Sequence, residues 1–170
     1  MPTASDVLVG VTGAIYGAPT GTALPTTAAA VLDGAFVEMG YISDAGIREN
    51  QALSTTNITA WQLGATVRKI QTAHDLTYAI DFMESSPAVL EAYYGNEDAG
   101  TVEIKGEQGV IQSWVFDVID GSNIVRLVLP DGQITDKGEV SYVNANALIY
   151  PVTITCYPDG SDVKAYRYQS

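Results

Sequence analysis

The clearest pattern of hydrophobic and polar positions lies between residues 76 and 82. The hydrophobic residues Leu76, Tyr78, Ile80 and Phe82 alternate with Thr77, Ala79 and Asp81. This period of two is typical of a strand with one buried face. We therefore expect a strand that ends near Met83.

A short helix is predicted directly after this strand, over residues 86–95. Ser85 or Ser86 can cap it, because a serine hydroxyl accepts a hydrogen bond from a free N–H of the first turn. Pro87 suits the first helical position, and Gly95 suits the left-handed residue that ends many helices. The apolar residues that share one face, and should pack on the sheet, are Val89, Leu90 and Tyr93.

Two long stretches before this strand have no lasting periodicity. Residues 10–35 are rich in Gly, Ala, Thr and Pro, so residues 1–35 are predicted to be an extended arm. After a strand-like segment at 36–42, residues 43–65 are mostly polar and are predicted to be a long loop. Loops longer than about 12 to 15 residues are usually functional or disordered. The alternative is a mobile surface hairpin.

The second half predicts a meander of antiparallel strands. The candidate strands are residues 101–105, 110–119, 124–129, 133–135 and 147–157, separated by turns at 120–123, 130–132 and 136–138. Pro151 requires an edge, a bulge or a strand start at its position. We expect one mainly β domain over residues 1–170, an antiparallel β-sandwich or partly open barrel with one short flanking α-helix.

Several of these segments together resemble the major tail protein of long-tailed (siphovirus-type) phages of actinobacteria. The resemblance rests on Trp-Gln-Leu-Gly-Ala-Thr-Val-Arg at 61–68, Phe-Met-Glu-Ser at 82–85 and Pro-Ala-Val-Leu-Glu-Ala-Tyr-Tyr-Gly at 87–95. Residues 9–16, 22–26 and 36–43 resemble the amino-terminal arm and first strands of the same family. The remaining residues match only as a pattern of strands.

The resemblance implies a structural virion protein and no catalytic motif. It implies hexameric rings stacked into a hollow tail tube, through which phage DNA passes during ejection without specific binding. The other expected partners are a tape measure protein in the lumen during assembly, a tail terminator, and tail-tip or baseplate proteins. The tube would be assembled in the host cytoplasm, since the amino terminus lacks the basic and apolar regions of a signal peptide. No apolar run reaches the ~18 residues that span a bilayer, so no membrane insertion is expected.

In that family the loop between the early strands reaches across to neighbouring subunits, which assigns residues 43–65 to contacts between subunits or rings. The expected contact residues are Asp44, Arg48, Glu49, Trp61 and Arg68. Arg68 and Lys69 are neighbours on a strand and should point to opposite faces. One of them is predicted to pair with Glu49 or Asp44 of the next ring. Large aromatics are common interface anchors, so Trp61 is placed at an interface, and Trp114 in the core.

Composition adds a strong negative charge: 20 Asp and Glu stand against 8 Lys and Arg, a formal net charge of -12. Such a surface repels nucleic acid, and it also serves solubility. If the chain encloses a channel, an acidic wall would let DNA slide without sticking. The single Cys156 cannot form an internal disulfide and is predicted to be a buried core residue.

Catalysis and metal binding find little support. A set of His74, Asp81 and Ser113 can be assembled on paper, but no spacing supports it, and the motifs of a nucleophile elbow, a phosphate loop or a zinc site are absent. The oxygen-rich residues Asp117, Asp120, Ser122 and Asn123 are explained by turn chemistry as well as by calcium. We predict no catalytic residue, cofactor or metal.

Two other functions remain open. One is a β-sandwich binding or adhesion module on the virion surface, which exposed aromatics clustered in one cleft would favour. The other is an acidic chaperone-like module, which should remain a small soluble oligomer at every concentration.

Overall fold

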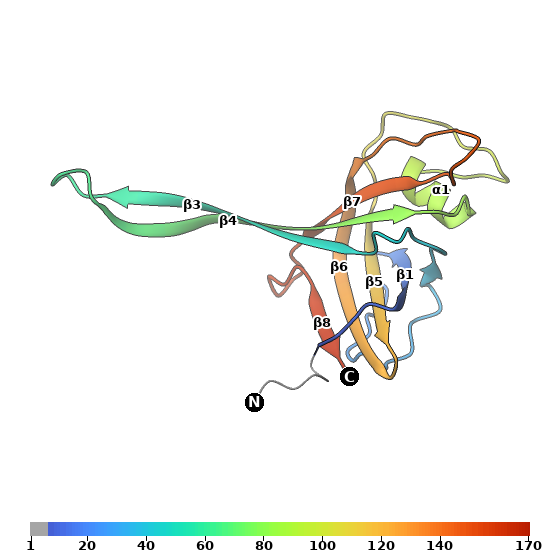
Figure 1. Cartoon of the computed structure of the whole chain (residues 1–170), viewed down its shortest axis with the longest axis horizontal. Coiled ribbons are helices and arrows are strands. Elements are labelled where there is room, and N and C mark those ends of the chain that lie inside the picture. Colours follow the sequence, from blue (N-terminus) through green and yellow to red (C-terminus); the bar gives the residue numbers. More distant parts are fainter. Residues whose placement is uncertain (1–6) are drawn as a thin grey trace.

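The computed structural model describes residues 7–170 and contains eight strands and one helix (Figure 1). In chain order they are β1 (Thr12–Pro19), β2 (Val37–Glu38), β3 (Arg48–Thr59), β4 (Thr66–Phe82), α1 (Pro87–Tyr94), β5 (Ile111–Asp120), β6 (Asn123–Lys137), β7 (Tyr150–Tyr157) and β8 (Tyr166–Gln169).

All the strands belong to one antiparallel sheet in the order β2-β1-β5-β6-β7-β4-β3, with β8 paired to β6. β6 is long enough to have two partners on one edge: its first half pairs with β8 and its second half with β7. The prediction of a mainly β, antiparallel fold with one short helix is confirmed.

The sheet curls because the segment from Val37 to Ser43 joins its two sides. At one end of this segment the Met39 N–H donates to the Ile15 carbonyl at 2.8 Å, which attaches it to β1. At the other end the Ser43 N–H donates to the Asp81 carbonyl at 2.9 Å, which attaches it to the end of β4. The body is therefore a partly open barrel.

The concave face of this barrel carries the core. Its fully buried large side chains include Trp114, Tyr78, Phe82, Phe116, Ile15, Ile80, Leu129 and Ile154. Trp114 and Cys156 are 1% and 2% exposed, so both predicted core positions are confirmed. The alternating face predicted for β4 is also buried, from Leu76 to Phe82.

Helix α1 matches the prediction closely. The Ser86 hydroxyl accepts from the Val89 N–H, Pro87 is the first residue, and Gly95 ends the helix with φ of 89°. Its buried residues are Val89 and Tyr93, and the Tyr93 hydroxyl donates to the Gly138 carbonyl at 2.8 Å. The helix thereby closes over the sheet.

The extended arm predicted over residues 1–35 is wrong for its middle part, because residues 12–19 form β1 inside the sheet. Glycines conceal this strand: a Cβ on Gly13 would lie 2.4 Å from the Asp117 backbone carbonyl oxygen, so this position has room for glycine alone. Residues 7–11 of the predicted arm precede β1 and residues 20–35 follow it, while residues 1–6 lie outside the described part. After β1, Ala28 is buried and the Ala30 carbonyl accepts a hydrogen bond from Arg126 of β6.

The long loop predicted over residues 43–65 is mostly a strand. Residues 48–59 form β3, which pairs with β4 along its whole length. Every residue of β3 is exposed, so no alternation of apolar and polar residues could reveal it. A surface hairpin, the alternative interpretation, describes the shape correctly.

Three smaller differences concern the second half. Residues 101–105 form no strand beyond a single bridge at Thr101, and β8 is absent from the predicted strands. The turn predicted at 130–132 is continuous β6, because Gly132 lets the Trp114 ring lie across the strand and donate to its carbonyl at 3.3 Å. A Cβ on Gly132 would lie 2.7 Å from that ring.

None of the helices in residues 7–170 is long and apolar enough to cross a membrane.

Candidate functional site

The most prominent surface feature is the hairpin of β3 and β4, which leaves the body and projects far into solvent (Figure 1). We call residues 52–73 the distal arm and the rest of the chain the body. Burial begins at Leu76, and all residues of the distal arm except Ala60 are exposed. At roughly 3.3 Å per residue the distal arm reaches about 30 Å beyond the body.

The tip of the distal arm is apolar and uncovered. Trp61 and Leu63 are 97% and 103% exposed, and a backbone hydrogen bond of 2.8 Å from Ala60 to Ala65 closes the turn that presents them. Four more large hydrophobic residues on the arm are exposed: Leu53, Ile58, Val67 and Ile70. Exposed apolar side chains in such number on one projecting element are typical of an interaction site.

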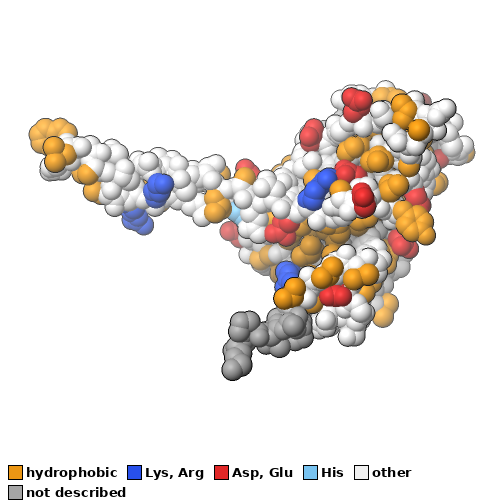
Figure 2. Space-filling view, viewed as in Figure 1, with side chains coloured by type: hydrophobic (Ala, Val, Ile, Leu, Met, Phe, Trp, Pro, Cys, Tyr) orange, Lys and Arg blue, Asp and Glu red, His pale blue; other side chains and the backbone are white. Residues whose placement is uncertain are grey.

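The distal arm is also a basic part of an acidic protein. It contains Arg68 and Lys69 and no Asp or Glu, so the remaining residues hold all 20 carboxylates and only six Lys and Arg. Figure 2 shows blue side chains on the arm and red ones on the body. Arg68 pairs in register with Ile58, and Lys69 with Asn57, so the two cations occupy opposite faces of the hairpin, as their positions in the strand predict.

The five predicted contact residues fall in three different places. Trp61 and Arg68 lie on the distal arm. Arg48 and Glu49 lie where the arm joins the body, while Asp44 lies in the loop just before β3. The structure of one chain therefore does not gather them into one site.

The two residues at the arm's base already have partners within the chain. Arg48 forms an ion pair with Asp81 at 3.0 Å. Glu49 accepts hydrogen bonds from the Tyr78 hydroxyl at 2.9 Å and from the Gln51 amide at 2.6 Å. Burial, and then the bond to the Glu49 carboxylate, raise the pKa of Tyr78 above its ordinary value. These contacts fix the direction in which the arm leaves the body.

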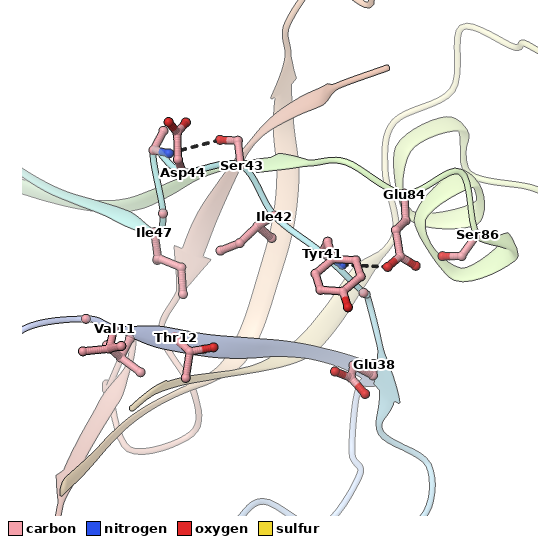
Figure 3. Close-up of a pocket in the computed structure, with 16 residues that line it drawn as sticks. Val11, Thr12, Glu38, Tyr41, Ile42, Ser43, Asp44, Ile47, Glu84 and Ser86 are labelled. Carbon is pink, nitrogen blue, oxygen red and sulfur yellow. Dashed lines mark hydrogen bonds between the residues drawn. The ribbon is translucent and has the colours of Figure 1, made fainter. Parts of the chain in front are cut away.

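Asp44 belongs to a groove of about 1120 Å³ on the body, between the start of β1 and the segment that leads into β3 (Figure 3). We call it the β1 groove. It exists because β2 pairs with β1 only at Tyr16 and Gly17, after which the chain crosses to β4. Its apolar lining residues are Val11, Tyr41, Ile42, Ile47 and Val118.

Three carboxylates also line the β1 groove: Glu38, Asp44 and Glu84. Glu84 accepts a hydrogen bond of 3.0 Å from the Tyr41 N–H, and it lies against Gly40, whose φ is 74°. A Cβ on Gly40 would lie 2.2 Å from the Glu84 carboxylate, so the glycine allows this close approach. Within residues 7–170 none of the three carboxylates has a Lys or Arg partner.

A buried ion pair, which was not predicted from the sequence, stabilises the face of the sheet that lies opposite the core. Arg126 donates to both oxygens of Asp117, at 2.6 and 2.8 Å, and to the Ala30 carbonyl at 2.6 Å. The bonds and charge of Asp117 raise the pKa of Arg126. A signal was present: Asp117 and Arg126 are directly opposite across the predicted turn at 120–123, where opposite charges are expected to pair.

Two of the three residues considered for catalysis, Ser113 and Asp81, make structural contacts. The Ser113 hydroxyl is buried and donates to the Pro130 carbonyl at 2.7 Å, and Asp81 is paired with Arg48. At the turn considered for calcium, Asp120 accepts from the Val9 N–H at 3.0 Å. No group of three or more potential metal ligands occurs in the described part of the chain.

Comparisons with known proteins agree with this picture of an assembly protein. A family described as phage tail tube protein matches residues 2–168. A chain of the anti-feeding prophage baseplate, solved by cryo-EM with 6-fold symmetrisation, has a TM-score of 0.51 at 13% identity, covering 100% of this chain and 97% of that one. No match was found among curated proteins.

Two further solved structures are more distant. A chain of the anti-feeding prophage tube terminating cap has a TM-score of 0.49 at 9% identity, with full coverage of both chains. A chain of the gene transfer agent virion has a TM-score of 0.43 at 12% identity, covering 82% of this chain and 92% of that one.

Proposed function

Because this chain belongs to the phage tail tube protein family, we propose that its copies close into hexameric rings that stack into the hollow tube through which the phage genome is ejected. Membership of the family makes the chain a structural protein of the virion and not an enzyme.

The main support for this proposal is the exposed apolar tip of the distal arm. In a free monomer the hairpin exposes Trp61 and Leu63 to water. This exposure is unfavourable, because exposing apolar area costs about 25 cal/mol per Å². A neighbouring subunit would cover these side chains. The arm's reach of about 30 Å suits a contact with an adjacent ring better than one within a compact dimer.

Ring closure is supported by the free strand edges. β3 pairs only with β4, and residues 12–14 of β1 pair only with β5, so both present unpaired backbone groups among residues 7–170. Proteins either cover such edges or use them for pairing. A heterologous contact between unlike edges generates a ring when its rotation closes. Six subunits are proposed by analogy with the 6-fold symmetrised assembly that holds the similar chain.

The net charge supports a lumen for DNA. With a formal charge of -12 per chain, a closed ring surrounds its axis with a strongly negative potential. Phosphates are repelled from such a wall, so DNA passes without binding. The proposed partners are the tape measure protein that fills the lumen during assembly, and the terminator and baseplate proteins that close the two ends. From the sequence resemblance we assign the tube to a long-tailed phage of actinobacteria.

The β1 groove does not favour the adhesion alternative. A carbohydrate-binding cleft is expected to gather several exposed aromatics, whereas the β1 groove contains one, Tyr41. The exposed Trp61 is on the distal arm and not in that groove.

Sedimentation velocity across a concentration series, with negative-stain electron microscopy of the same samples, tests the proposal. We expect discrete rings at low concentration and tubes of uniform width at high concentration. A chain that stays monomeric throughout, or that forms only dimers or solid fibrils, would refute self-assembly around a lumen.

A further inference from the structure

Two features remain without a counterpart in a single chain: the basic distal arm with its apolar tip, and the β1 groove with its three carboxylates. The arm cannot reach the groove of its own body. β3 and β4 stay paired along their length and carry the tip away from the body (Figures 1 and 2). Whatever covers the tip must therefore come from another molecule.

The β1 groove matches the distal arm in chemistry. Its apolar residues include Val11 and Tyr41, which are 69% and 79% exposed. They are therefore available to cover the Trp61 ring and the Leu63 side chain of another molecule. In Figure 3, Val11 and Ile47 line the groove from opposite sides, while Tyr41, Glu38 and Glu84 lie toward one end. Apolar side chains and carboxylates thus occupy neighbouring parts of one groove.

The two surfaces are also complementary in charge. Glu38 and Asp44 are exposed carboxylates with no Lys or Arg partner among residues 7–170. Arg68 and Lys69 are exposed cations and likewise form no ion pair within that range. Opposite potentials on two surfaces steer their encounter and fix the register of docking.

We propose that the β1 groove is the acceptor site for the distal arm of a second copy of this chain. Trp61 and Leu63 pack on the apolar residues of the groove, and one of the two arm cations faces Glu38 or Asp44. This inference rests on the proposed self-assembly, and it adds the identity of the surface that receives the arm. Because donor and acceptor are different surfaces, the contact is heterologous and propagates from copy to copy.

A disulfide trap tests the pairing directly. In the variant with Leu63→Cys and Tyr41→Cys, each arm should cross-link to the groove of the next copy and give a ladder of covalent oligomers on a non-reducing gel. The native Cys156 does not interfere, because it is 2% exposed. The matched control combines Leu63→Cys with Ile104→Cys, at a position that is 79% exposed on a different part of the body, and should give no ladder.

Charge exchange provides a second test that does not need a cross-link. Arg68→Glu with Lys69→Glu should raise the concentration needed for assembly by about tenfold, since the attraction between the docked cation and the groove becomes a repulsion. Adding Glu38→Lys and Asp44→Lys should restore most of the loss. Adding Glu107→Lys and Glu139→Lys instead makes the same change of net charge at exposed positions outside the groove, and should restore none of it.

The outcomes separate this inference from the proposed function. Rings or tubes that form without a ladder in the variant with Leu63→Cys and Tyr41→Cys would overturn the groove as acceptor and leave the tube intact. Cross-linking at position 104, or from tip to tip, would do the same. Equal rescue by both pairs of lysine substitutions would also overturn it. A wild-type chain that forms no rings would instead refute the proposed function.

Discussion

At the scale of single residues, the most consequential contact is the buried pair of Arg126 and Asp117. Its side chains are 8% and 11% exposed, and Arg126 also holds the carbonyl groups of Thr27 and Ala30. One guanidinium thus ties the segment between β1 and β2 to the face of the sheet. Removing one partner of a buried ion pair is far more costly than removing an exposed one.

We therefore expect Arg126→Ala to lower the free energy of unfolding by about 3 to 5 kcal/mol, because it leaves the Asp117 carboxylate buried and unpaired. Urea denaturation followed by tryptophan fluorescence measures this. The matched control is Lys105→Ala, whose partner Glu103 is 66% exposed, and which should cost less than about 1 kcal/mol. Equal losses in the two variants would contradict the role assigned to Arg126.

The Cys156 thiol is expected to be unreactive in the native protein. Burial raises the pKa of this thiol from its ordinary value of 9.0 to about 12. Because the folded pKa is the higher one, its contribution to stability is complete below pH 9 and is lost as the pH rises toward 12. In the native protein at about pH 8 the thiol should not react with a disulfide reagent within minutes, whereas in guanidinium chloride one thiol per chain should react at once. Rapid reaction of the native protein would place Cys156 outside the core.

At the scale of elements, the distal arm should be separable from the body. All its residues except Ala60 are exposed, and the core begins only at Leu76. Replacing residues 55–71 by an Asn-Gly turn should leave the melting temperature of the body within a few degrees of the wild type, because no buried area is lost. Assembly should be abolished. Thermal unfolding and sedimentation of the same variant measure both. A shortened chain that still formed tubes would show that the arm is not the connecting element.

An element can be predicted from the sequence when its pattern of apolar and polar residues reflects which side chains are buried. The alternation in β4, the alternating buried residues of β7 and the Ser86–Gly95 boundaries of α1 all express packing against the core, and the predictions for them are correct. β3 has no buried side chain and therefore no such pattern. In β1 the alternation is hidden by glycines at Gly13 and Gly17. The close contact that requires Gly13, with the Asp117 carbonyl oxygen of β5, cannot be inferred from local sequence.

The candidate site is predictable only in part for a related reason. The exposed Trp61 and the opposed Arg68 and Lys69 can be placed from local sequence. The β1 groove cannot, because it unites the start of β1, the segment before β3 and Glu84, which are distant in sequence. Its formation depends on where the chain leaves β1 and crosses to β4.

At the scale of the whole molecule, charge is unevenly divided: the distal arm holds two cations and no carboxylate, whereas the remaining residues hold all 20 carboxylates and six Lys and Arg. Docking of the arms on neighbouring bodies would neutralise the cations and leave an assembly that is acidic throughout. We expect assembled particles not to retain double-stranded DNA in a mobility-shift assay, even at low salt. Retention that weakens steeply as salt increases would contradict an acidic lumen.

The proposed role requires that this chain by itself forms a closed ring around a channel. The most direct measurement is rotational analysis of averaged end-on views of the purified particles by cryo-electron microscopy. We expect six-fold symmetry with a central lumen wide enough for duplex DNA. Averages that lack a lumen, or chains that remain monomeric at every concentration, would contradict it.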